Sequence, residues 1–377
     1  MSAVKEIEAV IKRGIALFFK ACILLLKAIT ERLFFLRDPV VTLSTLQGWR
    51  YPVFLINSLA SASTVGVHWR DVSNAYQILP IELFFFRLRI SSFLPPPRRG
   101  ILIYDREFGR QIACKKNVSI DKKYYLTPYP PDSYVYPYFA PPTFYLKRLS
   151  KLARRLSKRS GPRPIKLFFA GADHKEGYSP VARFMMLTRS TIIEHVVESL
   201  ARPKYDNLKT KTKIIVTRDF FNDIAKHKMS PKEFLRNAAL SDFFLCPPGW
   251  AIPHCHNIVE AMSVGSIPIT NYSNYMSPPL SHGINCLSFD SLEDLTAVLD
   301  YISSIEYSDI ERMREGVVRY YSTFLDANNA GKRFLERAGE ISTLLVNDEK
   351  VSEYCDELER SMQEIPMQKL LSTPARS

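Results

Sequence analysis

The sequence predicts an α/β protein with a doubly wound parallel sheet. Between residues 165 and 304, short apolar runs alternate with segments of helical periodicity, and strands that alternate with helices form parallel βαβ units. The chain has 377 residues, of which 46% are hydrophobic and 24% charged. That length exceeds one ordinary compact core, so two globular domains are expected.

The charge balance favours an anionic partner. The chain has 51 Lys and Arg against 38 Asp and Glu, a net charge of +13, which suits phosphorylated metabolites, nucleic acid or an acidic membrane surface alike. Its six cysteines are widely spaced and form no CxxC motif. This pattern is unlike a zinc ribbon, a thioredoxin site or a secreted disulfide framework, so a reducing compartment is expected.

The first element expected is an amphipathic helix over residues 14–36. Lys20 and Lys27 divide its apolar positions into blocks far shorter than the roughly 18 to 20 residues that a membrane span needs. No small-residue cleavage site follows, which disfavours a signal peptide. The two lysines share one side of the helix with Glu31. The helix therefore either faces the core of the first domain or lies in the surface of a membrane.

The rest of the N-terminal half is less regular. Short β-prone runs at 51–57 and 100–105 are predicted strands. A second apolar patch, at 78–97, fits either a membrane contact or a buried strand with a charged end. Residues 124–145 combine six prolines with many aromatic residues, which excludes a regular helix and indicates an ordered connection.

A basic helix is predicted within residues 146–164, where we place the domain boundary. Eight basic residues and no acid occur there, and Gly-Pro-Arg-Pro ends the helix. Its apolar positions fall on one face and are Leu146, Leu149, Leu152, Ala153 and Leu156. Such a helix is either a solvated linker or a contact for anionic lipid headgroups or a phosphate-bearing acceptor.

The second half carries the regular alternation of elements. Ser230, with an acid three residues later, is a predicted N-cap, and a helix is expected to begin near Pro253 or His254. The predicted strands are 165–171, 213–218, 242–247 and 266–271, and the other predicted helices are 180–200, 230–240 and 290–304.

Two loops at the carboxyl edge of this sheet are unusual, Gly171–Gly177 and Pro247–Pro253. Ligands of open parallel sheets bind at this edge, where strands give way to helices. Glycine lets the backbone approach a ligand closely, and a helix start offers free N–H groups with about half a positive charge. Both features suit a phosphate group.

Glu260 is a single carboxylate among small and apolar residues of the helix that follows. If that helix begins near Pro253, Glu260 lies roughly 9 Å along it. A nucleotide with its diphosphate at the helix start would bring its ribose to the helix flank, where a carboxylate accepts hydrogen bonds from two neighbouring hydroxyls. The other interpretation is an acid that caps a neighbour or faces solvent.

Residues 240–280 resemble the signature of exostosin-like glycosyltransferases. That signature has a Cys-Pro-x-Gly turn, a helix with Glu-Ala, and then Gly-x-Ile/Val-Pro. "KLFFAG" at 166–171, with Arg183 downstream, is also similar to the first strand of that family's donor-binding domain. The resemblance covers about 165–300, and the residues of the signature that match in identity and spacing are Glu260, Ala261, Gly265, Ile267 and Pro268.

The resemblance implies a GT-B fold, in which two Rossmann-like domains face each other across a cleft. The implied division is an acceptor-side domain at 1–160, a nucleotide-sugar-binding domain at 161–340, and a helix with a polar tail at 341–377 that returns to the first domain. It also implies that Glu260 holds the ribose and that the turn at Gly249 lies beside the donor phosphates.

One position departs from the family pattern. Asn257 stands where the family commonly has Arg, so other residues are expected to neutralise the donor phosphates. The candidates for that role are His256, Lys175, Arg183 and Arg218. Gly171, at the start of the first loop, is expected to let the backbone approach the nucleotide.

A metal cofactor is not expected. His254, Cys255 and His256 are consecutive and point in different directions on a helix, which leaves too few ligands for zinc. The two histidines are instead predicted to donate hydrogen bonds near the phosphates. No Asp-x-Asp motif occurs in the chain, so basic side chains and the helix dipole are expected to stabilise the departing nucleotide.

These observations predict transfer of a sugar from a nucleoside diphosphate sugar, with a UDP-sugar preferred, to a hydroxyl of a glycan or lipid-linked glycan. The reaction is expected to invert the anomeric centre, to serve polysaccharide or glycoconjugate assembly, and to run in the cytoplasm at an anionic membrane surface. A carboxylate or histidine would act as general base. The candidates are Asp173, His174 and Asp105, together with Asp71, Glu107 and Asp132.

The rival interpretation is a non-catalytic basic protein that binds a membrane or nucleic acid. The net charge and the two basic amphipathic helices support it, but the chain carries no signature of an RNA- or DNA-binding module.

Overall fold

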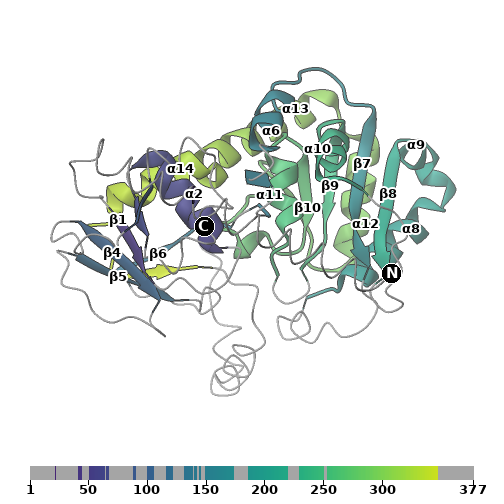
Figure 1. The fold of residues 1–377 in the computed structure, drawn as a ribbon. Coiled ribbons are helices and arrows are strands. Elements are labelled where there is room, and N and C mark those ends of the chain that lie inside the picture. The colour runs from purple at the N-terminus through teal and green to yellow at the C-terminus, as the bar shows by residue number, and fades with distance from the viewer. Residues whose placement is uncertain are drawn as a thin grey trace, which may run out of the picture.

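The structure is a computed structural model that describes residues 22, 41–44, 51–63, 65–67, 88–90, 100–105, 116–121, 131–138, 140–141, 144–145, 149–173, 186–219, 229–249 and 253–346. These residues form two parallel sheets with helices packed around them (Figure 1). The predicted α/β class with parallel strands is confirmed. The division into two domains at residues 160 and 340 stays a prediction.

The first sheet has seven strands in the order β3-β2-β1-β4-β5-β12-β6 within the described part of the chain. Of these, β4 coincides with the strand predicted at 100–105, and β12 joins from the C-terminal side, between β5 and β6. The strands are β1 (Val41–Ser44), β2 (Val65–Val67), β3 (Leu88–Ile90), β4 (Ile101–Asp105), β5 (Lys116–Asp121), β6 (Ser133–Val135) and β12 (Thr343–Leu345).

Residues 51–57 form a helix and not the predicted strand. Helix α2 (Tyr51–Ala62) is buried from Phe54 to Ala60 and packs against α14 (Ala327–Arg337). The two backbones approach closely, because a Cβ on Gly331 would lie 2.2 Å from the carbonyl oxygen of Ser58. Burial between the sheet and α14 overrides the β-prone composition of this segment.

The second sheet contains all four strands predicted for it. Its order is β11-β10-β9-β7-β8, with β11 (Leu287–Ser288) added at one edge. The predicted strands are β7 (Ile165–Asp173), β8 (Thr212–Asp219), β9 (Ser241–Cys246) and β10 (Ile267–Thr270). Strand β9 is buried along its whole length, as expected where helices cover both faces of a parallel sheet.

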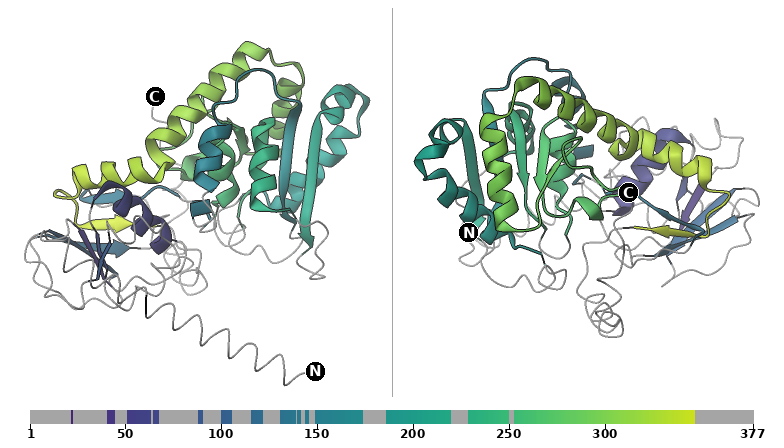
Figure 2. Two further views of the ribbon diagram at one scale, coloured as in Figure 1. Left: turned by 45° about the horizontal axis from the view of Figure 1, so that its top comes forward. Right: turned by 180° about the vertical axis from the view of Figure 1, so that it is seen from behind.

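Helices α10 (Pro231–Ala239) and α11 (His256–Met262) cover one face of this sheet, and α8 (Arg189–Leu200) and α12 (Leu292–Ser304) cover the other (Figures 1 and 2). The caps follow the sequence. Ser230 forms the predicted capping box with Glu233, and Ser291 forms another with Asp294.

The last helices carry the chain from the second sheet back to the first (Figure 2). Helix α13 (Tyr307–Tyr320) leads into a π-helical turn (Tyr321–Leu325), and α14 follows against α2. The short elements that remain are α9 (Asp206–Thr210) and the 3₁₀ turns Pro203–Tyr205 and Ser273–Tyr275.

Helix α6 (Leu149–Leu156) is the predicted basic helix, shorter than its sequence pattern. It packs beside α10. Leu149 and Ala153 are buried, and Leu152 and Leu156 lie against the core.

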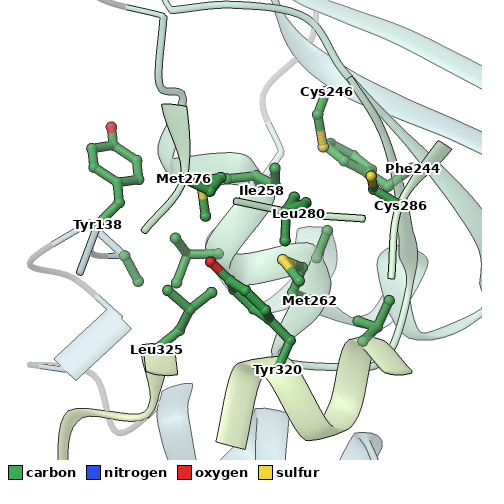
Figure 3. Packing of buried hydrophobic residues seen from close by; sticks show 14 of the residues in the cluster. Tyr138, Phe244, Cys246, Ile258, Met262, Met276, Leu280, Cys286, Tyr320 and Leu325 are labelled. Carbon is green, nitrogen blue, oxygen red and sulfur yellow. The ribbon is translucent and has the colours of Figure 1, made fainter. Parts of the chain in front are cut away.

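Helix α11 is fixed by an apolar cluster on its inner side. Ile258 and Met262 point into a cluster with Met276, Leu280 and Tyr320 (Figure 3). Because residues four apart share one face of a helix, this packing sets the rotation of α11 and turns Glu260, two positions from each of them, toward the opposite side.

Several predictions lie outside the described residues. These are the N-terminal helix at 14–36, apart from the helical Cys22, most of the patch at 78–97, and the chain after Val346. Within the part that the structure describes, every helix is too short or too polar to cross a bilayer.

Candidate functional site

The candidate site lies at the carboxyl edge of the second sheet, around the connection from β9 to α11. The amide of Gly249 donates to the carbonyl oxygen of Pro253 at 3.0 Å and closes a turn. Helix α11 begins at His256, with Cys255 as its N-cap, so the predicted start at Pro253 or His254 is wrong. Glu260 therefore lies about 6 Å along the helix instead of 9 Å.

Glu260 is a buried carboxylate, with 4% of its surface exposed. Its Oε2 lies 2.8 Å from Nδ1 of His256, one turn earlier on α11. Among the described residues, no other side chain forms a hydrogen bond with this carboxylate. Nδ1 of His256 thus fixes one carboxylate oxygen and leaves Oε1 to accept hydrogen bonds from another donor.

Asn257 ties the first turn of α11 to strand β7. Its side-chain amide donates to the carbonyl oxygen of Ala170 at 3.1 Å, and the residue is buried. Gly171 lies beside it, since a Cβ at that position would meet Asn257 Nδ2 at 3.6 Å and the ring of Phe169 at 3.1 Å. The position where the resembled family has a cation therefore holds a short amide that joins two elements of the sheet.

Arg189, which the sequence did not single out, joins three segments at this edge. Nε and Nη2 donate to the carbonyl oxygen of Pro248 at 3.1 and 2.9 Å, and Nη1 donates to that of Ala172 at 3.1 Å. Nη2 also lies 3.2 Å from Sγ of Cys255. The guanidinium is buried and places a positive charge directly beneath the Pro248–Gly249 turn.

A sequence signal for Arg189 does exist. It is the first residue of α8, after the N-cap Thr188. A cation at a helix N-terminus opposes the helix dipole, so its presence there indicates a role outside the helix.

His254 belongs to the packing of the site and not to its polar surface. Its ring is 1% exposed and lies 4.5 Å, centroid to centroid, from the ring of Tyr138 in the N-terminal half. Burial lowers the pKa of His254 from 6.5 to about 3, so the ring is neutral at physiological pH. The prediction that His254 donates a hydrogen bond near a phosphate is not supported by this position.

The depressed pKa predicts acid sensitivity. Between pH 6.5 and pH 3 the unfolded chain binds a proton at His254 that the folded protein does not bind, so stability is lost as pH falls through this window. From about pH 7 to about pH 5 the loss at this position should reach about 2 kcal/mol. We expect the thermal stability of His254→Phe to fall less over that range than that of the wild type.

His282→Phe provides the control, because His282 is an exposed histidine. Melting curves of the three proteins across the pH range check the prediction. An equal pH dependence in wild type and His254→Phe would contradict it.

The consecutive residues 254 to 256 contact three different partners. The His254 ring packs on Tyr138, Cys255 accepts from Arg189, and His256 bonds to Glu260. The side chains thus diverge, as their spacing on a helix start predicts.

The remaining candidates are placed less fully. Asp173 and Arg218 stand at the ends of β7 and β8, where Ala172 pairs with Arg218, and Asp105 ends β4 in the first sheet. Asp132 is exposed and forms a hydrogen bond with the hydroxyl of Ser342. Five candidates lie outside the described residues. They are the candidate bases Asp71, Glu107 and His174 and the candidate phosphate ligands Lys175 and Arg183.

No protein-family model and no curated protein matches the chain. Among solved structures, a glycosyltransferase from Rickettsia africae is similar at 10% identity over 80% of this chain and 98% of that chain, with a TM-score of 0.45. Anabaena HepE in complex with UDP-glucose is similar at 11% identity over 81% of this chain and 100% of that chain, with a TM-score of 0.36. Likeness at this level does not identify the activity of this chain.

Proposed function

We propose that this protein is a glycosyltransferase that moves a sugar from a nucleoside diphosphate sugar, preferably a UDP-sugar, to a hydroxyl of a glycan or glycolipid. Glu260 carries the proposal. It is a carboxylate at 4% exposure, at the carboxyl edge of a parallel sheet, and within the described part of the chain it accepts one hydrogen bond, from His256. This edge is where α/β sheets bind their ligands.

The energetics of burial support a ligand for this carboxylate. A buried carboxylate is costly unless hydrogen bonds satisfy it, and its two oxygens offer about four acceptor positions. His256 uses one of them. The two neighbouring hydroxyls of a ribose supply two O–H donors on adjacent carbons, which matches the acceptor positions that remain. Charge-assisted bonds of this kind are about twice as strong as neutral ones.

Arg189 supports the placement of the donor phosphates at the Pro248–Gly249 turn. Helix α11 has only seven residues, so its dipole contributes less than a long helix would. The buried guanidinium beneath the turn supplies the positive charge that Asn257 does not, through bonds to Pro248 and Ala172. Lys175, Arg183 and Arg218 are proposed as further phosphate ligands, with Gly171 and Gly249 giving the backbone room.

The proposed chemistry is a single displacement with inversion. The acceptor hydroxyl oxygen forms a bond to the anomeric carbon, the bond from that carbon to the diphosphate oxygen breaks, and the nucleoside diphosphate leaves. The hydroxyl proton passes to a general base. Asp173, His174 and Asp105 stay the proposed candidates, of which Asp173 is the last residue of β7, at the same edge as the Pro248–Gly249 turn.

Metal independence is the second testable part of the proposal. The chain has no Asp-x-Asp motif, and the charge beneath the turn comes from Arg189. We expect EDTA to change nucleotide affinity by less than about twofold, because fixed cations replace a bridging metal. Titration calorimetry with UDP, in EDTA and in magnesium, measures this. A fall in affinity of more than about tenfold in EDTA would show that a metal bridges the phosphates.

The activity itself is tested by incubating the protein with a panel of UDP-, GDP- and CDP-sugars and measuring nucleotide release. Release should depend on one donor and increase with a glycan or glycolipid extract as acceptor. Glu260→Ala should remove it. No release with any donor, or undiminished release by Glu260→Ala, would contradict the proposal.

The acceptor side of the proposal includes an anionic membrane surface, at which a lipid-linked glycan would be presented. The predicted N-terminal helix lies outside the described residues apart from Cys22. Within the described residues, the basic helix α6 is the second predicted contact for such a surface.

A further inference from the structure

Helix α6 carries two opposite stripes of side chains. Positions 149, 152, 153 and 156 are the apolar stripe, which faces the core. The other stripe has the same spacing, i, i+3, i+4 and i+7, and consists of exposed basic residues. Lys151, Arg154 and Arg155 belong to the helix, and Lys158 lies in the turn two residues beyond its end. Residues at this spacing share one face of a helix. We call this second set the α6 basic stripe.

The basic surface continues onto the neighbouring elements. Arg159 is exposed just after the stripe, and Lys232 and Arg236 are exposed on α10, which packs against α6. Lys213, at the start of β8, bonds through Nζ to Asn237 of α10 at 2.8 Å. Exposed cations thus lie on three segments, of which α6 and α10 pack together and β8 is bonded to α10.

Acids also lie near this surface, and Glu311 and Glu315 line a hollow with Arg159 beyond the end of α6. Glu233 of α10 belongs to the capping box with Ser230. Asp326 lies 4.0 Å from Arg154, whose side chain is nevertheless 73% exposed. The α6 basic stripe therefore keeps a net positive charge toward solvent.

The form of the surface favours an extended anionic partner. The stripe stands on the side of the helix opposite the core-facing positions, and its charges are spread along about two turns. By contrast, the hollow of about 420 Å³ between the end of α6 and α13 mixes both signs of charge, Arg159 and Arg319 with Glu311 and Glu315. A small anion would need converging cations, whereas a planar array of headgroups matches a spread stripe.

Aromatic platforms for nucleic acid are missing from the described part of this surface. The exposed large hydrophobic residues that the structure describes are Val197, Ile284, Tyr301 and Val318, and none of them lies on α6 or α10. Single-stranded nucleic acids are held by bases stacked on aromatic side chains. Lipid headgroups need only the charges.

We infer that the α6 basic stripe, with the adjoining cations of α10, docks the protein electrostatically on an anionic lipid bilayer. This deepens the membrane part of the proposed function and does not depend on the donor site. Figure 1 places α6 at the edge of the second sheet where the strands begin, opposite the edge that carries Arg189 and the Pro248–Gly249 turn. Docking through α6 therefore leaves the donor site open to solvent.

Vesicle sedimentation with the full chain tests the inference. The probes are vesicles of mixed phosphatidylglycerol and phosphatidylcholine, compared with pure phosphatidylcholine. We expect binding to the anionic vesicles alone, with strong weakening between about 0.05 and about 0.5 M salt. The variant Lys151→Gln/Arg154→Gln/Arg155→Gln/Lys158→Gln should lose roughly tenfold or more in partition coefficient, with unchanged UDP affinity.

The matched control removes four exposed cations elsewhere, in Arg202→Gln/Lys209→Gln/Arg312→Gln/Lys332→Gln. Its net charge equals that of the α6 variant, and we expect it to lose less than about threefold. Melting curves verify folding, and the single charge reversal Arg155→Glu gives a milder test if the fourfold variant does not fold.

Three results would overturn the inference. The first is equal binding of the wild type to anionic and neutral vesicles. The second is an equal loss in the α6 variant and the control, since net charge alone would then explain binding. The third is α6-dependent binding to single-stranded RNA that is tighter than binding to vesicles, which would assign the surface to nucleic acid. If neither the wild type nor the variants bind UDP, the donor site is contradicted, whereas α6-dependent binding to anionic vesicles would still support the docking surface.

Discussion

Glu260→Gln is expected to weaken UDP binding by roughly 10- to 100-fold. The substitution keeps the size of the side chain but removes its charge and one of its two acceptor oxygens. Its amide nitrogen must face either His256 or the ribose hydroxyls, because His256 Nδ1 lies 2.8 Å from the present carboxylate. Titration calorimetry with UDP measures the change, and the KM for the donor sugar should rise with it.

Glu315→Gln is the matched control for this prediction. Glu315 is an exposed acid on α13, and its replacement removes the same charge away from the site. Wild-type UDP affinity in Glu260→Gln, with an unchanged melting curve, would mean that the carboxylate does not contact the nucleotide.

Arg189→Gln is expected to lower the free energy of unfolding by about 3 to 5 kcal/mol. The change removes the guanidinium that bonds to Pro248, Ala172 and Cys255, so buried carbonyl oxygens lose their donors. Arg189→Lys should be intermediate, because an ammonium keeps the charge but has a single nitrogen with which to reach three groups. Denaturant unfolding of both variants measures the effect.

Arg312→Gln serves as the control for this series, since Arg312 is 71% exposed and pairs only with Asp309 on the surface. We expect its stability to change by less than about 0.5 kcal/mol. If Arg189→Gln unfolds at the wild-type denaturant concentration, the three segments at the carboxyl edge are held together by other contacts.

The second sheet was predictable from sequence because its local signals agree with its tertiary structure. Strand β9 is a short apolar run buried on both faces, and α10 and α12 begin at serine N-caps with an acid three residues later. The first sheet carries weaker local signals, since four of its described strands have only three residues. Strands this short carry little periodicity, and β12 pairs across more than 200 residues of chain, with Ser119 opposite Thr343.

Helix α2 shows why the composition of residues 51–57 predicted a strand where the structure has a helix. Its apolar, β-prone residues are buried by the sheet on one side and by α14 on the other, through the close approach of Gly331 to Ser58. The local sequence pattern of residues 51–62 cannot predict that α14, from the C-terminal part of the chain, will pack on this segment.

The candidate site was predictable only where its chemistry is unusual for its surroundings. Glu260 stands out as a charge among apolar residues, and the structure places it in a buried position. Arg189 offers one sequence signal, a cation at the start of a helix, but its partners are backbone carbonyl oxygens of Ala172 and Pro248, which no sequence pattern shows. The sequence shows that Asn257 departs from the pattern of the resembled family. Its hydrogen bond to the carbonyl oxygen of Ala170 is visible only in the structure.

The most direct measurement is a double-mutant cycle between Glu260 and the ribose hydroxyls. Affinities are measured for UDP and for its 2′,3′-dideoxy analogue, each with wild type and with Glu260→Gln. If Glu260 holds the ribose, the wild type loses roughly tenfold or more on removal of the hydroxyls, whereas Glu260→Gln loses much less, so that the two changes are coupled. Equal losses in both proteins would show that the ribose hydroxyls and Glu260 do not interact, and would contradict the assignment of this edge of the sheet as the donor site.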